Sequence, residues 1–178
     1  MLFRSETGAR WLYHGHWVFS EWQLTQAWAN TSATEGGTSA PGSSGAPVRS
    51  DRLDVTEREA FQIYADHINE HYGKVNQIYN NAGIAYTGDV DISQFKDIER
   101  VMDVDFWGVV NGTKAFLPHL SASGDGHVVN ISSLLGLLSI PGQAAYNSAK
   151  FAVRGFTEAL RQEMVVNREP VKAMPALL

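Results

Sequence analysis

The spacing of apolar residues divides the chain after residue 50 into segments of two kinds. Short apolar runs bounded by turn residues predict strands, whereas apolar positions three or four apart predict helices. The predicted strands are one that ends over 52–55, two over 75–79 and 127–132, and one that begins over 171–174. The predicted helices are 56–72, 93–119 (with room for a break) and one that begins near 143. Because strands and helices alternate, the sequence predicts an α/β fold in which helices flank a parallel sheet.

Several element ends carry their own signals. Thr56, followed three positions later by Glu59, has the pattern of a capping box, which predicts the start of a helix there. Gly73 has the residue type that commonly ends a helix in a left-handed conformation. The last helix carries one apolar stripe, formed by Ala149, Val153, Phe156, Leu160 and Met164.

The N-terminal part differs in composition from the rest. Four of the five tryptophans fall within residues 1–48, and residues 31–47 are almost wholly Thr, Ser, Ala, Gly and Pro. Such a composition buries little apolar surface and is typical of a linker. We therefore expect a separate, partly disordered segment over 1–48, an α/β domain over 49–174 and a short tail over 175–178.

Composition narrows the classes of function. The chain has 178 residues and a net charge of −5, and no basic cluster indicates nucleic-acid binding. It has no cysteine, and its six histidines are scattered, so we expect neither disulfides nor a metal site. No apolar run has the length of a membrane span or the form of a secretory signal. These features predict a cytoplasmic protein without a nucleic-acid or membrane partner.

The candidate chemistry lies between residues 127 and 156. Tyr146 and Lys150 are four positions apart, so a helix places them on one face, one turn from each other. Ser133 stands thirteen positions before Tyr146, at the end of a predicted strand. A strand end and a helix start can bring these three side chains into one small volume. The alternative is a core tyrosine beside a solvated lysine.

These residue types suit acid–base chemistry. A tyrosine hydroxyl titrates at about 10 in model compounds, and a neighbouring ammonium favours the phenolate. A Tyr–Lys pair therefore forms a general acid/base, and a serine hydroxyl can stabilise a developing oxyanion. An electron source is missing from this set, so the prediction requires a cofactor that carries hydride.

Ser133 and the segment Tyr146–Lys150, together with Asn81-Ala82-Gly83 after an upstream strand, resemble the motifs of the short-chain dehydrogenase/reductase family. The resemblance implies a Rossmann-like doubly wound parallel sheet and an NAD- or NADP-dependent oxidoreductase that interconverts an alcohol and a ketone. It implies that Tyr146 transfers the proton, that Lys150 tunes Tyr146 and binds the nicotinamide ribose, and that Ser133 holds the substrate oxygen.

The same resemblance assigns further residues and a partner. Asn81, Ala82 and Gly83 would line the cofactor cleft. Asp54 and Val55 would lie near the adenine ring, although Asp54 also suits a simple turn. The helices near 105–120 and 145–167 would form the interface of a homo-oligomer.

The sequence departs from the family pattern in two ways. Asp105 stands where the family usually has an asparagine of the proton relay, and a carboxylate there would partly neutralise Lys150. The glycine-rich loop that holds the pyrophosphate after the first strand is not found, and the family's C-terminal part is also missing. The sequence therefore predicts an incomplete family member over about 49–173. The alternatives are an inactive remnant and a helix-mediated interaction module, neither of which binds dinucleotide.

Overall fold

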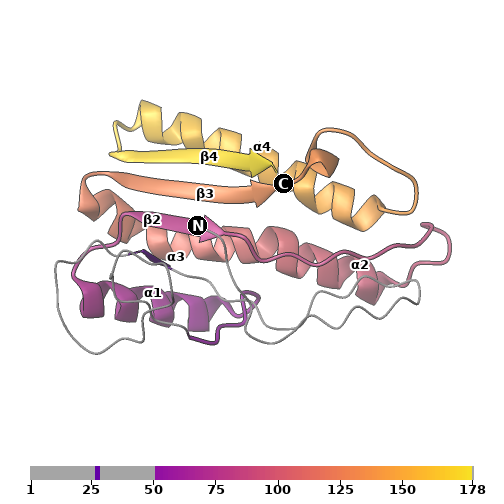
Figure 1. The fold of residues 1–178 in the computed structure, drawn as a ribbon, viewed down its shortest axis with the longest axis horizontal. Coiled ribbons are helices and arrows are strands. Elements are labelled where there is room, and N and C mark those ends of the chain that lie inside the picture. The colour runs from indigo at the N-terminus through magenta and orange to yellow at the C-terminus, as the bar shows by residue number, and fades with distance from the viewer. Residues whose placement is uncertain (1–26, 29–50, 178) are drawn as a thin grey trace, which may run out of the picture.

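A computed structural model of the chain describes residues 27–28 and 51–177 (Figure 1). Apart from Ala27–Trp28, the segment predicted over 1–48 lies outside the described residues, and so does Leu178. The sheet has the order β1-β2-β3-β4. Its strands are β1 (Ala27–Trp28), β2 (Gln77–Asn80), β3 (Gly126–Ser132) and β4 (Val171–Leu177). Strands β2, β3 and β4 are parallel, whereas β1 pairs antiparallel with β2.

Four α-helices lie between or beside these strands in the described part of the chain. They are α1 (Arg58–Tyr72), α2 (Phe95–Met102), α3 (Gly108–Ser123) and α4 (Ala144–Val166). A π-helical segment, Asp103–Trp107, joins α2 to α3, and a 3₁₀ turn, Leu134–Gly136, follows β3. The helical region predicted over 93–119 is therefore present with a break of π type. The predicted α/β class with a partial Rossmann-like parallel sheet is confirmed.

The strand register places the end of β2 beside β3, two residues before β3 ends. Asn80 at the end of β2 is paired with Asn130, and Ser132 at the end of β3 is paired with Leu177 in β4. Because parallel strands end at the same edge of a sheet, the chain that leaves β2 toward Gly83 and the chain that leaves β3 toward Ser133 emerge side by side. In open α/β sheets this carboxyl edge is where ligands bind.

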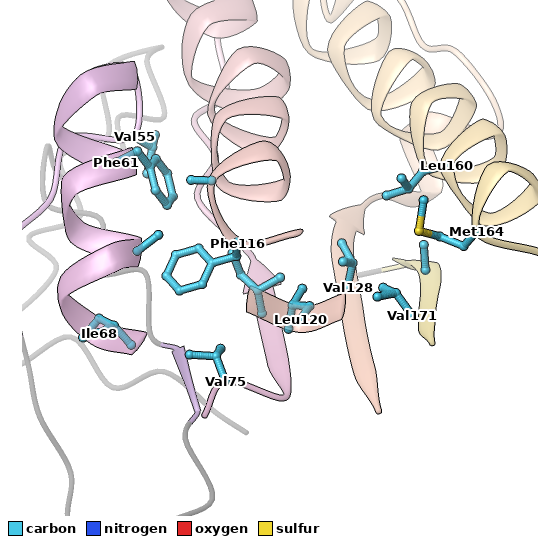
Figure 2. Packing of buried hydrophobic residues seen from close by; sticks show 14 of the residues in the cluster. Val55, Phe61, Ile68, Val75, Phe116, Leu120, Val128, Leu160, Met164 and Val171 are labelled. Atoms are coloured by element: carbon cyan, nitrogen blue, oxygen red, sulfur yellow. The ribbon is translucent and has the colours of Figure 1, made fainter. Parts of the chain in front are cut away.

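The main core lies between the sheet and the helices α1, α3 and α4 (Figure 2). Phe61 of α1 meets Phe116 of α3 edge to face, with ring centroids 6.3 Å apart. Val128 of β3 is fully buried, and Leu160 of α4 belongs to the same cluster. Burial of each such side chain contributes about 1.5–3 kcal/mol. This packing fixes α4, and with it Tyr146 and Lys150, against the strand that ends at Ser133.

Two predictions near the start of α1 are wrong. Residues 52–55 form no strand: they lead into a turn whose backbone is held by a side chain, since Asn111 donates to the Val55 carbonyl at 2.9 Å. The apolar pattern came from packing, because Leu53 and Val55 are buried. The capping box is also absent, because α1 begins after Glu57 and the Thr56 hydroxyl donates to Asp54 instead, at 2.8 Å.

The end of α1 is as predicted. Gly73 has φ 74° and ends the helix in the left-handed conformation, with its N–H donating to the Asn69 carbonyl. A glycine meets this requirement without a steric cost.

Candidate active site

The residues of the candidate site come from four parts of the chain that meet at the carboxyl edge of the sheet. Gly83 follows β2, Ser133 follows β3, and Asp105 lies in the π-helical segment. Tyr146 and Lys150 lie one turn apart near the start of α4. Site assembly therefore depends on the parallel pairing of β2 with β3 and on the packing of α4 against β3.

Lys150 is the centre of the arrangement. Its side chain is only 3% exposed, and Nζ lies 3.1 Å from Oδ2 of Asp105. Nζ also donates a hydrogen bond to the Ile131 carbonyl at 3.3 Å. The ammonium lies 5.4 Å from the centroid of the Tyr146 ring, within the range of a cation–π contact. The structure thus brings Lys150, Asp105 and Tyr146 together.

Asp105 is fully buried and is held from a second side. Its Oδ1 accepts a hydrogen bond from the Ile84 amide at 2.7 Å, while Oδ2 faces Lys150. Burial raises the pKa of the Asp105 carboxyl above its ordinary value, and the charge of Lys150 and the Ile84 amide oppose that rise. Oδ2 faces Nζ of Lys150 at 3.1 Å, and this ion pair is the contact through which the charge of Lys150 acts on the carboxyl.

Gly83 allows this ion pair to lie close to the chain that leaves β2. A Cβ at this position would stand 3.1 Å from Oδ2 of Asp105 and 3.2 Å from Nζ of Lys150. Such contacts are shorter than normal packing distances, so a larger residue would displace one of the two charged groups. The glycine of the predicted motif therefore serves the ion pair directly.

Ser133 and Ser132 have different surroundings, as expected for neighbours in an extended segment. Ser133 is buried, and its Oγ accepts a hydrogen bond from the Leu135 amide at 3.3 Å. Ser132 donates instead to the Lys150 carbonyl at 3.0 Å and so joins the end of β3 to the backbone of α4. The assignment of Ser133 to the substrate oxygen remains a prediction.

Asn147 is a residue of the site that the sequence analysis missed. It is buried beside Tyr146 in the first turn of α4. Its Nδ2 donates to the carbonyls of Leu135 and Leu138 at 2.7 and 3.0 Å, and its Oδ1 accepts from the Ile140 amide at 3.4 Å. Asn147 thereby fixes the loop after Ser133 onto the helix turn that carries Tyr146. Its position between Tyr146 and Lys150 is the signal that could have identified it.

A buried polar network lies beneath the site. Asn80 of β2 donates to Asn130 of β3 at 2.7 Å and to Thr113 of α3 at 3.1 Å. Asn130 in turn donates to Thr157 of α4 at 2.9 Å. Satisfied buried networks of this kind rigidify a core. This one ties both strands of the site to the two helices behind them.

Other predicted residues lie apart from this cluster. Asp54 is exposed in the turn before α1, where its carboxylate accepts from the Thr56 amide at 3.0 Å. Val55 is buried in the main core, and Ala82 packs against the same core. Asn81 is exposed. A cofactor-binding role for these four residues therefore remains a prediction.

The described residues fit one end of a dinucleotide. A lysine ammonium has three N–H donors, and Lys150 spends one on the Ile131 carbonyl, so donors remain for a ligand hydroxyl. The other end has no matching site within residues 51–177. Helix α1 begins after Glu57 and close to Asp54, without a glycine-rich turn, and carboxylates there oppose a pyrophosphate.

Fold and site together define a member of the short-chain dehydrogenase family. The family model described as short chain dehydrogenase matches residues 27–174, and the chain belongs to this family of oxidoreductases. The predicted resemblance is thus confirmed. The match was expected to start at about residue 49, and it starts earlier, at residue 27. Members of the family generally use NAD or NADP.

The chain is also similar in sequence to individual oxidoreductases. It is 74% identical over 128 residues to "Putative oxidoreductase SadH" of Mycobacterium tuberculosis, a match that covers 72% of this chain and 46% of that protein. It is 35% identical over 112 residues to 3-ketodihydrosphingosine reductase of Bacteroides thetaiotaomicron, covering 63% of this chain and 42% of that protein. The chain therefore spans about half the length of these relatives.

A solved structure has a fold similar to that of this chain. The short-chain dehydrogenase/reductase from Burkholderia phymatum, determined in complex with NAD, superposes with a TM-score of 0.70 at 34% identity. The match covers 75% of this chain and 47% of that protein. Within residues 51–177, no helix combines the length and apolar character needed to cross a bilayer, and no cluster of side chains is suited to a metal ion.

Proposed function

We propose that the chain carries the acid–base site of an NAD(P)-dependent oxidoreductase that interconverts an alcohol and a ketone. The observation that carries the proposal is the position of the buried Lys150 ammonium, 5.4 Å from the Tyr146 ring and bonded to the strand that leads to Ser133. Membership of the oxidoreductase family supports the same reaction class.

Each residue has one role in the proposed reaction. The nicotinamide supplies or accepts the hydride when the cofactor is bound. The Tyr146 hydroxyl gives its proton to the carbonyl oxygen during reduction and takes it back during oxidation. Lys150 favours the phenolate by its charge and offers N–H donors to the ribose. Ser133 donates a hydrogen bond to the oxygen on which negative charge develops.

The loop between Ser133 and α4 indicates the class of substrate. Four of its large apolar side chains face solvent, with exposed fractions of 55% for Leu134, 41% for Leu137, 44% for Leu138 and 44% for Ile140. A group of exposed apolar side chains beside polar catalytic groups is typical of a ligand surface. We infer an apolar alcohol or ketone, and the name of the related 3-ketodihydrosphingosine reductase is consistent with such a ketone.

Turnover of matched ketones tests this function. The purified chain is incubated with NADH or NADPH and a series of methyl ketones of increasing chain length, and nicotinamide absorbance is followed. We expect kcat/KM to rise with chain length and Tyr146→Phe to lower it by about 10²- to 10⁴-fold. Tyr79→Phe is the matched control, because that hydroxyl bonds to Gln77 within β2 at 3.0 Å. Equal rates for Tyr146→Phe and the unmodified chain would refute the assignment.

A second candidate function is an interaction module, located like the enzyme in the cytoplasm. It is favoured by aromatic side chains on the two helical regions expected to form an interface: Trp107 is 41% and Phe151 43% exposed. Sedimentation of the unmodified chain and of Phe151→Ser separates the candidates. A dimer that Phe151→Ser dissociates, in a chain without turnover, would favour the module.

A further inference from the structure

Asp105 forms a buried ion pair with Lys150, whose ammonium the proposed reaction uses. We propose that Asp105 is a positioning residue that holds the Lys150 side chain in its charged form and in its place beside Tyr146 before any cofactor is bound. The inference deepens the proposed function and rests on it, because it assigns the group that prepares the catalytic lysine.

The geometry fixes both partners from several sides. Asp105 is attached to the loop after β2 through the Ile84 amide at 2.7 Å, and Lys150 is attached to β3 through the Ile131 carbonyl at 3.3 Å. The pair itself, at 3.1 Å, joins the π-helical segment to α4. Gly83 leaves room for both groups. Asp105 therefore links the π-helical segment and the loop after β2 to the helix that carries Tyr146.

The charge of the pair is what the carboxylate of this chain adds at a position where the family usually has an asparagine. A buried ammonium without a counter-charge is costly and tends to lose its proton. Within 51–177, the pair is hydrogen-bonded to the Ile131 carbonyl from β3 and to the Ile84 amide from the loop after β2, and the Tyr146 ring from α4 lies beside its ammonium. None of these three carries a negative charge while Tyr146 is protonated, so Asp105 is the group in contact with Lys150 that supplies one.

The local backbone places Asp105 in this position. Asp103 and Asp105 both belong to the π-helical segment, yet Asp103 is exposed and Asp105 is fully buried. Short π-helical segments inside helices often occur at functional sites, where the wider turn redirects a side chain. The segment thus directs one of two neighbouring carboxylates into the site and leaves the other as a natural control.

Chemical labelling of lysines tests the proposal without cofactor or substrate. The full chain and its variants Asp105→Asn and Asp103→Asn are treated briefly with an amine-acylating ester over a range of pH, and labelled peptides are quantified by mass spectrometry. We expect Lys150 to be protected in the unmodified chain and in Asp103→Asn. In Asp105→Asn we expect Lys150 to be labelled at least about tenfold faster at neutral pH, because the side chain loses the carboxylate that holds it in the buried site. Exposed Lys96 serves as the internal reference.

Two further variants separate positioning from general stability. Asn is nearly isosteric with Asp and keeps an oxygen for the Ile84 amide, so Asp105→Asn is expected to fold. Ile68→Val loosens the distant core, and it should leave Lys150 protected. Asp105→Glu, which retains the charge, should restore much of the protection. Equal labelling of Lys150 in Asp105→Asn and the unmodified chain would overturn the proposal, and so would equal acceleration in Ile68→Val.

The labelling result is independent of the proposed reaction. A chain without turnover in which Asp105→Asn still accelerates labelling of Lys150 would support the positioning role and count against the proposed function. A chain with turnover in which labelling does not change would do the reverse. The two ideas therefore fail by different observations.

Discussion

At the scale of single residues, the buried carboxyl of Asp105 links the stability of the chain to pH. Burial raises its pKa above the ordinary value of 3.8, and Lys150 and the Ile84 amide only partly offset this effect. Just above pH 3.8 the native chain therefore binds this proton more than the unfolded chain does. Stability falls with pH wherever the native state binds more protons, so the Asp105 contribution decreases as pH rises through the raised pKa.

Urea unfolding at a series of pH values checks this direction. The free energy of unfolding of the unmodified chain, minus that of Asp105→Asn, should decrease as pH rises from below 3.8 and become constant above the raised pKa. Asp103→Asn, which removes an exposed carboxylate from the same segment, should not show this pattern. A difference that increases with pH over that range would mean that the ion pair outweighs burial.

Sequence spacing identified part of the site and missed the rest for physical reasons. The i, i+4 spacing of Tyr146 and Lys150 holds because α4 is regular there. The opposite surroundings of Ser132 and Ser133 follow from strand geometry in the same way. Asn147 was missed because its partners are backbone groups of a loop, which the side chains of that loop do not specify; its place between Tyr146 and Lys150 was the remaining signal.

At the scale of elements, the approach of α3 to β2 depends on Gly112. A Cβ at this position would clash with Oδ1 of Asn80 and lie 2.9 Å from Cζ of Phe61. We predict that Gly112→Ala lowers the free energy of unfolding by about 1–3 kcal/mol, because overpacking displaces α3 and strains the Asn80–Asn130 hydrogen bond.

The matched control for this prediction is Gly155→Ala in α4. A Cβ there meets nothing within 4 Å, so the same chemical change should stabilise the chain, by about 0.5–1 kcal/mol, through helix propensity alone. Urea unfolding measures both variants. Opposite signs are expected, and stabilisation by Gly112→Ala would show that α3 can shift without cost.

The prediction of helices and strands succeeded where an apolar pattern in the sequence coincides with a neighbouring element that buries it. Strand β3 and helix α4 begin within one residue of the predicted positions, since Val128 of β3 and Leu160 and Met164 of α4 are buried in one core. The segment 52–55 has two buried apolar residues but pairs with no strand in the described structure, so the strand end predicted there does not form. A pattern reports burial, whereas a strand also requires a neighbour for its backbone.

At the scale of the whole molecule, the described fold corresponds to under half of the solved relative's length, 47% of that chain. It contains the parallel strands that position Ser133, Tyr146 and Lys150. Between residues 51 and 177 it has no glycine-rich turn for a pyrophosphate, and α1 begins next to carboxylates. In the proposed function, the donors that the described residues offer, those of Lys150, face the nicotinamide riboside half of the cofactor.

Thermal unfolding with whole and half cofactors tests this division. At about 100 times its dissociation constant a ligand adds about 2.7 kcal/mol of stability, and each kcal/mol raises the midpoint by about 2–4 °C for a chain of 150–250 residues. We predict that reduced nicotinamide mononucleotide raises the midpoint as much as NADH or NADPH does at equal concentration, because the adenosine phosphate half finds no partner in the described fold.

The variant Lys150→Met supplies the control, since it removes the N–H donors proposed for the ribose and leaves an unbranched side chain that is one atom shorter. It should abolish the shift caused by the mononucleotide and by both dinucleotides alike. A much larger shift with NADH or NADPH than with the mononucleotide would contradict the prediction, and it would mean that residues outside 51–177 hold the pyrophosphate. A larger shift with one dinucleotide alone would in addition identify the cofactor to use in the ketone assay. The comparison of three ligands therefore shows which half of the cofactor this chain recognises, independently of whether it completes a catalytic cycle.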